Sequence, residues 1–277
     1  MARVTYWVAV VCALLLMLIV FYFSQKQEIS WSNVADRFPE TVTSHITLTK
    51  WWQASALFRW EWQKPMEYDC KKKVAMGNWH VCMDKPYEIK PPCLVYSFGI
   101  SGDWTFDDAM GNLGCEVHSF DPSIGKQDFD RSKNVHFHNL GISGFDSDSF
   151  VARKDVYVHN RQIWKMRRVQ SVKKMLGHAN KTIDVLKIDV ETSEWPSVKD
   201  LVESGVLSSV RQLLIEWHLF LDYPKTDKYV GLYNTYMNLK DKGFSIFRVD
   251  FHHNTVNKNN LLFQADVDYV NTAYKGK

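Results

Sequence analysis

The sequence predicts an α/β domain whose β-sheet is mostly parallel and closes with a C-terminal antiparallel hairpin. Three observations support this fold class. Short apolar runs of strand length alternate with segments whose apolar residues recur at helical spacing. Glycine or proline follows most of these segments, as is common where helices and strands end. The last two apolar runs have no helical segment between them, which predicts a hairpin.

Five apolar runs predict the parallel strands of this sheet. The run at 183–190 is the strongest, because it is rich in β-branched residues. Parallel strands are buried on both faces, so we expect helices on both sides of the sheet. The five runs are residues 94–98, 116–121, 134–138, 183–190 and 213–218.

The predicted helices have recognisable start and stop residues. Asp103 can cap a helix that Gly114 ends. A second helix begins at Glu194, carries a proline in its first turn and ends at Gly205. A basic stretch at 165–174 is interpreted as the solvated face of another helix; the alternative is a site for an anionic acceptor or a membrane surface. The last helix and the two hairpin strands are residues 228–242, 244–251 and 262–270. The buried side of the helix at the basic stretch would present Ile163, Met166, Val169 and Val172.

The composition is that of a folded protein and excludes several classes. Of the 277 residues, 45% are hydrophobic and 23% are charged, and 13 glycines with 8 prolines are too few for a disordered or collagen-like chain. The net charge is only +3, so no nucleic-acid partner is expected.

The N-terminus has the length and character of a membrane anchor. Residues 6–23 carry no charge, and aromatic side chains gather at both ends of the run. A cleaved signal peptide is the alternative, but the run is long and lacks a small-residue cleavage pattern. We therefore expect a single-pass type II protein of the secretory pathway, in the Golgi or the ER lumen. The expected parts are a cytosolic tail (1–4), a transmembrane anchor (5–23), a stem with an aromatic helix (24–65) and the main domain (66–277).

The cysteines agree with an oxidising compartment. Four follow the predicted anchor: Cys70, Cys82, Cys93 and Cys115. They could form two disulfides in any of three pairings, or remain four buried free thiols. They contain no Cys-x-x-Cys pair, and no metal is expected to be bound.

Candidate binding residues follow the first two predicted strands. A doubly wound sheet binds its ligand at the carboxyl ends of its strands. The turn Gly99–Asp103 lets the backbone approach a ligand, and Asp121 stands 22 residues beyond Gly99. An acid at that spacing can accept hydrogen bonds from ribose hydroxyls. The alternative is an ordinary glycine turn followed by an Asp-Pro loop.

Acidic residues and a histidine follow the fourth and fifth strands, and meet at the same sheet edge. Such a cluster can orient a hydroxyl, remove its proton or hold a divalent cation. For Glu194, capping of the following helix is the favoured interpretation. The cluster comprises Asp189, Glu191, Glu194, Glu216 and His218.

Four of these blocks in order resemble a known family. Residues 93–103, 118–122, 186–191 and 215–218 are similar to the animal family of methyltransferase-like protein twenty-four, a relative of the FkbM-type O-methyltransferases. The resemblance covers about 66–277. It implies a Rossmann-like class I methyltransferase fold with a seven-stranded sheet, whose last strand is antiparallel, and S-adenosylmethionine as cofactor.

The resemblance also implies roles for individual residues. Ser97, Gly99 and Gly102 would line the methionine and adenosine side of the cofactor. Asp121 would hold the ribose. The adenine would lie near Gly141 and Ser143, and Asp189 would stand closest to the methyl group. The predicted catalytic residues are Asp189, Glu191 and His218, with Asp189 or His218 as the base on the acceptor side.

The sequence departs from this pattern at two places. Ser97 stands where the family usually has the acidic residue that opens the first glycine motif, and the third glycine of that motif is absent. Glu191-Thr192 stands where FkbM-type enzymes have Glu-Gly after the fourth strand. Three functions therefore stay open. The favoured one is O-methylation of a small-molecule or glycan acceptor. The alternatives are a type II membrane glycosyltransferase and a non-catalytic protein with a methyltransferase fold.

Overall fold

The computed structural model describes residues 47–155, 157–220, 223–251 and 264–275, all within one compact unit. The predicted tail, the transmembrane anchor and the first part of the stem lie outside these residues. Within the described ranges, no helix has both the length and the apolar character that crossing a bilayer requires.

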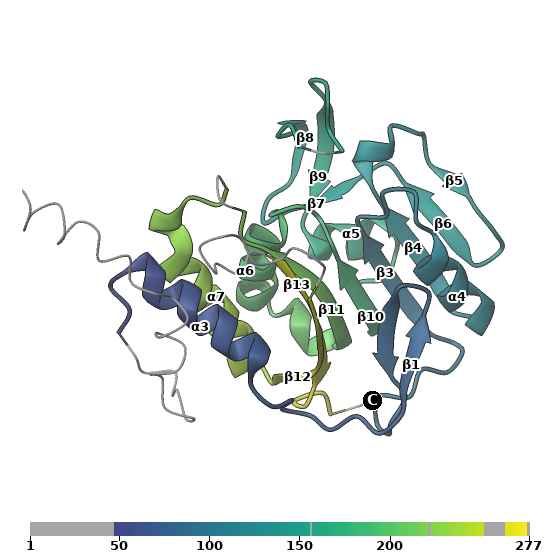
Figure 1. Cartoon of the computed structure of the whole chain (residues 1–277). Helices are drawn as coiled ribbons and strands as arrows, with labels where there is room; N and C mark the ends of the chain where they lie inside the picture. The colour runs from purple at the N-terminus through teal and green to yellow at the C-terminus, as the bar shows by residue number, and fades with distance from the viewer. Residues whose placement is uncertain (1–46, 156, 221–222, 252–263, 276–277) are drawn as a thin grey trace, which may run out of the picture. The chain divides into compact units, whose positions relative to one another are not determined.

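The main sheet has eight strands in the order β12-β13-β11-β10-β3-β4-β6-β5 (Figure 1). Strands β3, β4, β6, β10 and β11 run parallel, and β13 is antiparallel to both β11 and β12. The strands are β3 (Leu94–Phe98), β4 (Glu116–Phe120), β5 (Phe129–Asp130), β6 (Val135–His138), β10 (Ile183–Ile188), β11 (Val210–His218), β12 (Phe244–Asp250) and β13 (Gln264–Asn271).

This sheet confirms the predicted α/β fold with a mostly parallel sheet and a closing antiparallel hairpin. One detail differs from the prediction. The sheet gains an eighth strand at its edge, the two-residue β5, which is too short to leave a pattern in the sequence. The second hairpin strand lies between β11 and β12 and is buried over most of its length.

The helices lie close to their predicted positions because their ends are encoded locally. Helices α4 and α6 stop at Gly114 and Gly205, which adopt the left-handed conformation with φ of 100° and 77°. The helices are α3 (Trp51–Gln63), α4 (Thr105–Leu113), α5 (Val169–Met175), α6 (Glu194–Ser204) and α7 (Tyr229–Asp241). Short 3₁₀ turns occupy Pro122–Ile124, Val206–Ser209 and Thr226–Lys228.

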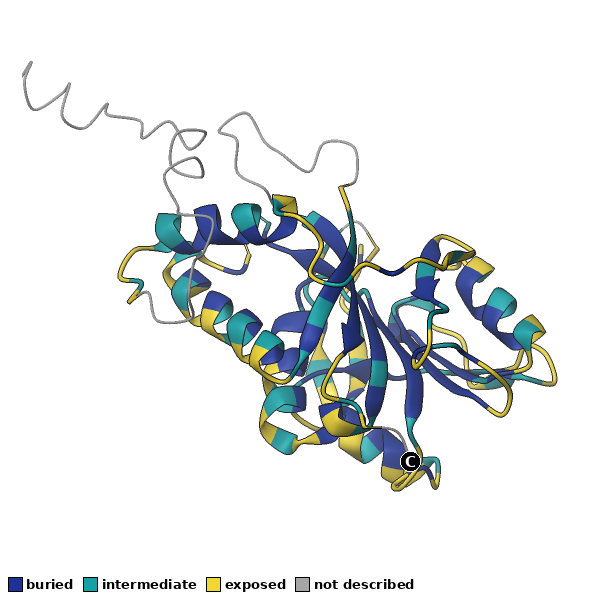
Figure 2. Ribbon diagram, turned by 90° about the horizontal axis from the view of Figure 1, so that it is seen from below, coloured by how far each residue is buried: buried dark blue, intermediate teal, exposed yellow. Residues whose placement is uncertain are grey.

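One face of the sheet is covered by α4 and by a small hairpin, β1 (Lys73–Met76) and β2 (Trp79–Cys82). Figure 2 shows the central strands of the sheet almost entirely in the colour of buried residues, in agreement with the burial of β3, β10, β11 and β13. The side chains that the sheet contributes to the cluster on this face are Val95, Val117, Val135, Val185, Leu214, Phe247 and Val270.

The aromatic segment of the predicted stem forms α3, which packs against α7. The fully buried Phe58 ring lies 5.4 Å from Trp195 of α6 and 5.2 Å from Tyr233 of α7. On the sheet side, Trp195 also contacts Trp217 of β11 at 4.4 Å. These aromatic side chains therefore form a packed core between the sheet and its helices.

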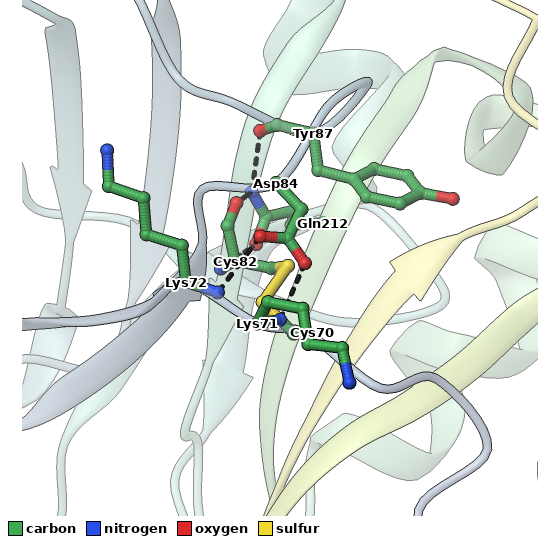
Figure 3. The surroundings of a disulfide bond; sticks show 7 residues. All are labelled: Cys70, Lys71, Lys72, Cys82, Asp84, Tyr87 and Gln212. Carbon is green, nitrogen blue, oxygen red and sulfur yellow. Dashed lines mark hydrogen bonds between the residues drawn. A yellow bond between two sulfur atoms is a disulfide. The ribbon is translucent and has the colours of Figure 1, made fainter.

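All four cysteines described form disulfides, Cys70–Cys82 and Cys93–Cys115. The first one closes the β1–β2 hairpin (Figure 3). The Gln212 amide of β11 accepts from the backbone N–H of Cys82 at 2.8 Å and donates to its carbonyl at 2.9 Å. This buried pair of hydrogen bonds fastens the hairpin to the centre of the main sheet.

A second, three-stranded sheet has the order β7-β9-β8 and stands beyond one end of the main sheet (Figure 1). The prediction of a single helix through Ile163, Met166 and Val172 is wrong in its first half, because residues 163–167 form β9 and the Ile163 side chain is 55% exposed. Its apolar residues three apart fit one face of a helix, but in β9 Ile163 and Met166 point to opposite faces, and only Met166 is buried. The strands are β7 (Gly141–Ile142), β8 (Ser147–Val151) and β9 (Ile163–Arg167).

Candidate functional site

A cavity of about 350 Å³ opens at the carboxyl ends of β3, β4 and β10. The main sheet supplies one wall through the residues that follow these strands. The small sheet supplies the other wall, with Phe150 of β8 and Trp164 and Met166 of β9. The position matches the edge at which doubly wound sheets bind ligands, and the volume suits a small organic molecule.

The turn after β3 requires its first glycine. Gly99 has a φ of 80°, and a Cβ there would lie 1.6 Å from the carbonyl oxygen of Asp189. The backbone of β3 therefore touches that of β10 at the floor of the cavity. The buried Lys187 side chain links the same two residues. Its ammonium donates to the Gly99 carbonyl and lies 3.5 Å from the Asp189 carboxylate.

Asp121, at the end of β4, is bound by the protein itself. Its Oδ2 accepts hydrogen bonds from the backbone N–H groups of Ile100 at 2.9 Å and Ser101 at 2.8 Å. Its Oδ1 accepts from the N–H of Ser123 at 2.8 Å and from the Ser123 hydroxyl at 2.6 Å. A carboxylate has about four acceptor positions, so Asp121 uses them to shape the glycine turn. A ribose hydroxyl would have to share or displace one of these bonds.

The turn after β10 is strained. Glu191 has a φ of 51° and Thr192 a φ of 80°, positive values that residues other than glycine rarely adopt, β-branched ones such as threonine least of all. Thr192 occupies the position where the resembled FkbM-type pattern has glycine, which adopts this backbone freely. Glu191 of this turn lines the cavity together with Asp189.

Behind this wall lies a buried ionic network centred on His218. Its Nδ1 is 3.0 Å from Oε1 of Glu194, and that oxygen also accepts from the His218 N–H at 2.8 Å. Its Nε2 lies 3.8 Å from Glu191 and 3.6 Å from Glu216. The prediction that Glu194 caps α6 is wrong, because this carboxylate holds His218 instead.

The network sets the protonation of its members. Burial alone would lower the pKa of His218, but the Glu194 carboxylate beside it raises that pKa to about 10. Burial raises the pKa of Glu191 to about 7, and burial with the Asp189 charge raises that of Glu216 to about 8. Near neutral pH, His218 is therefore an imidazolium, and Glu191 is close to half ionised.

The structure brings five of the predicted residues together on the cavity wall: Gly99, Asp121, Gly141, Asp189 and Glu191. Four others lie off that wall. Ser97 and His218 are fully buried, Gly102 is exposed in the glycine turn, and Ser143 is buried with its N–H bound to the Arg167 carbonyl at 3.1 Å.

The residues between β7 and β9 are the part of the wall that sequence reasoning missed. Tyr157, Arg153 and Asp155 line the cavity together with Phe150 and Trp164. The alternation of Ser147–Val151 is too polar to predict a strand, so no signal in the sequence placed this segment over the site.

Comparison of the sequence with known proteins finds similarity to methyltransferases. Residues 22–265 match a family model described as a methyltransferase domain. A human protein named "Probable methyltransferase-like protein 24" is 30% identical over 205 residues, which are 71% of this chain and 54% of that protein. Its rat counterpart is 34% identical over 151 residues, 52% of this chain and 39% of that protein. The chain thus spans about half the length, or less, of these curated relatives.

Among solved structures, the chain is similar to Aeropyrum pernix fibrillarin, crystallised with bound S-adenosyl-L-methionine. The TM-score is 0.36 with 14% identity, over 68% of this chain and 70% of that chain. The match to the family model extends over most of the sequence. This chain therefore belongs to the methyltransferase-domain family of the methyltransferase-like protein 24 type.

Proposed function

We propose that this chain uses S-adenosylmethionine to methylate a hydroxyl group of a small-molecule or glycan acceptor. The charge of the cavity wall carries the proposal. Four carboxylates line the cavity, those of Asp121, Asp155, Asp189 and Glu191, against the single guanidinium of Arg153 among the lining residues. Such a wall attracts a ligand with a sulfonium and an ammonium group and opposes an anionic diphosphate.

The remaining wall suits the flat, apolar part of the same ligand. The rings of Phe120, Phe150 and Trp164 face the cavity from β4, β8 and β9. Aromatic side chains offer apolar area and stacking surfaces to a purine. The residues present therefore fit both ends of S-adenosylmethionine, although Asp121 acts first as the organiser of the glycine turn.

Glu191 is the residue best suited to accept the proton of the acceptor. When bound, S-adenosylmethionine supplies a methyl group on a sulfonium sulfur; the acceptor oxygen bonds to the methyl carbon while the sulfur keeps the electrons of the broken bond. The hydroxyl proton has to leave as that oxygen gains its bond. Glu191 lies on the wall with its pKa raised by burial to about 7, so it can take this proton near neutral pH.

His218 acts as a positioning residue in this scheme. It is fully buried, lies off the cavity wall and is held by Glu194. As an imidazolium it stabilises the ionised form of Glu191, whose carboxylate lies 3.8 Å away. This assignment replaces the predicted role of His218 as a base that contacts the acceptor.

We also propose that residues 5–23 anchor the chain in a membrane of the secretory pathway, with the methyltransferase domain in the Golgi or ER lumen. The uncharged apolar run supports the anchor. The two disulfides support the lumenal side, since disulfides persist in oxidising compartments. Glycosylation or protease protection of the full chain in microsomes tests both points.

Calorimetry on the full chain separates the three candidate functions. We expect binding of S-adenosylhomocysteine at about one molecule per chain and no heat from UDP with Mn²⁺. Binding of UDP alone would establish the glycosyltransferase alternative. Binding of neither ligand by folded protein would leave the non-catalytic alternative.

The raised pKa of Glu191 predicts how activity depends on pH. A base must be ionised to act, so kcat/KM is expected to rise as pH increases through about 7. Glu191→Gln should abolish this rise and lower the rate by roughly 10²–10⁴-fold. The assay is release of S-adenosylhomocysteine across a panel of hydroxyl acceptors. Glu203→Gln, on the exposed side of α6, is the control; an unchanged pH profile in Glu191→Gln would exclude Glu191 as the base.

A further inference from the structure

A cluster of histidines lies apart from the cavity, at β4, β6 and the turn after α5. None of its members lines the cavity, so the proposed methyl transfer does not use them. Its central group is Glu116 and His118 of β4 with His178. His138 of β6 and Tyr96 of β3 surround that group.

Two imidazole nitrogens converge on one carboxylate oxygen. Nε2 of His118 lies 3.1 Å, and Nε2 of His178 3.2 Å, from the same Oε1 of Glu116. The three atoms all lie within 4.8 Å of one another. The two imidazoles are buried, whereas the Glu116 side chain is 41% exposed. Its other oxygen binds the Lys181 ammonium at 3.0 Å, which leaves Oε1 for the histidines.

The far nitrogen of each imidazole has its own partner. Nδ1 of His178 lies 2.8 Å from the Tyr96 hydroxyl. Nδ1 of His118 lies 2.9 Å from Nε2 of His138, whose Nδ1 lies 3.3 Å from a carboxylate oxygen of Asp128. Outer partners of this kind fix the tautomer and orientation of metal-binding histidines.

Counting hydrogens shows that this network lacks one positive charge. The path from Asp128 through His138 and His118 to Glu116 contains three contacts, each of which needs one hydrogen. Each neutral imidazole carries one N–H, so two rings supply two hydrogens and one contact pairs two acceptors. The deficit is the same for every choice of tautomers. A third proton or a metal ion removes it.

The geometry favours a metal ion, because His178 presents a second nitrogen to the same oxygen. With an ion between Glu116, His118 and His178, the Nδ1 hydrogens of His118 and His138 serve the other two contacts of the path. Ligands about 2.0–2.1 Å from a tetrahedral zinc ion lie roughly 3.3 Å apart, close to the 3.1 Å and 3.2 Å that separate the Glu116 oxygen from the two imidazole nitrogens.

We propose that Glu116, His118 and His178 form a zinc site that ties β4 to the turn after α5. Two imidazoles and one carboxylate are a ligand set that zinc accepts in proteins. The described cysteines cannot compete for the ion because all four form disulfides. The proposal does not depend on methyl transfer.

Zinc titration of the full chain tests this site. Protein stripped with a chelator should bind one Zn²⁺ per chain, and Co²⁺ should give the visible absorption of a tetrahedral site. His118→Gln and His178→Gln should abolish both signals. His136→Gln is the matched control, since its ring lies 5.3 Å from that of His118 but its Nδ1 binds Asp130. Asp128→Asn, at an exposed position, should weaken binding by about 10–100-fold without unfolding.

Three results would overturn the proposal. The first is the absence of stoichiometric zinc binding by protein that circular dichroism shows to be folded. The second is an equal loss of binding in His136→Gln and His178→Gln. The third is binding that survives His178→Gln but is lost in Glu216→Gln, because the ion would then lie at the cluster of Asp189, Glu216 and His218.

Discussion

Gly99→Ala is expected to abolish binding of S-adenosylhomocysteine and to destabilise the fold by about 3 kcal/mol or more. The added Cβ would stand 1.6 Å from the Asp189 carbonyl oxygen, a backbone atom that cannot move without separating β3 from β10. The positive φ of 80° adds strain. Thermal unfolding and calorimetry of the full chain measure the two effects.

Gly102→Ala is the matched control for that substitution. Gly102 lies in the same turn with a φ of 87°, but a Cβ there would meet nothing within 4 Å. Only the backbone strain remains, and we expect a loss of about 1–2 kcal/mol with ligand binding retained. Equal losses in the two variants would show that the contact with Asp189 does not determine the site.

Glu194→Ala is expected to cost about 3–5 kcal/mol, because it leaves the buried charge of His218 without its partner. Neither side chain is exposed, and one Glu194 oxygen binds both the N–H and the Nδ1 of His218. Burial would then lower the pKa of His218, and the proton that it carries would be lost. Chemical denaturation of wild type and variant at pH 7 measures the difference in unfolding free energy.

Glu203→Ala controls for the removal of a glutamate from the same helix. Glu203 pairs with Lys199 on the surface, where both side chains are 61% exposed. Such exposed pairs contribute about 0.3–0.5 kcal/mol. If Glu194→Ala cost no more than this control, the ionic network around His218 would not be a stabilising feature of the site.

The strands and helices that could be predicted are those whose signals are local. Leu94–Phe98 and Ile183–Ile188 are apolar runs in the sequence and buried parallel strands in the structure. Gly114 and Gly205 end helices because the left-handed conformation suits glycine. Residues 163–167 failed this test, because Ile163 and Met166 are spaced as on one face of a helix, whereas pairing with β7 and β8 makes the segment a strand.

The site was predictable in its position but not in its contacts. Gly99, Asp121 and Asp189 follow strands, so their meeting at one edge follows from the topology. The hydrogen-bond partner of each side chain does not follow from the topology. The N–H groups of Ile100 and Ser101 that bind Asp121, and the histidine that binds Glu194, come from other segments, and no spacing in the sequence encodes those partners. The disulfide pairing was open for the same reason.

Hydrogen exchange of the full chain, with and without S-adenosylhomocysteine, tests most directly whether the cavity is the donor site. The account predicts slower exchange in three peptides of the main-sheet wall, those that contain Gly99–Gly102, Asp121–Ser123 and Asp189–Ser193, and in the facing wall at Phe150 and Trp164. Saturating ligand that leaves all three unprotected, or that protects a different surface, would contradict it.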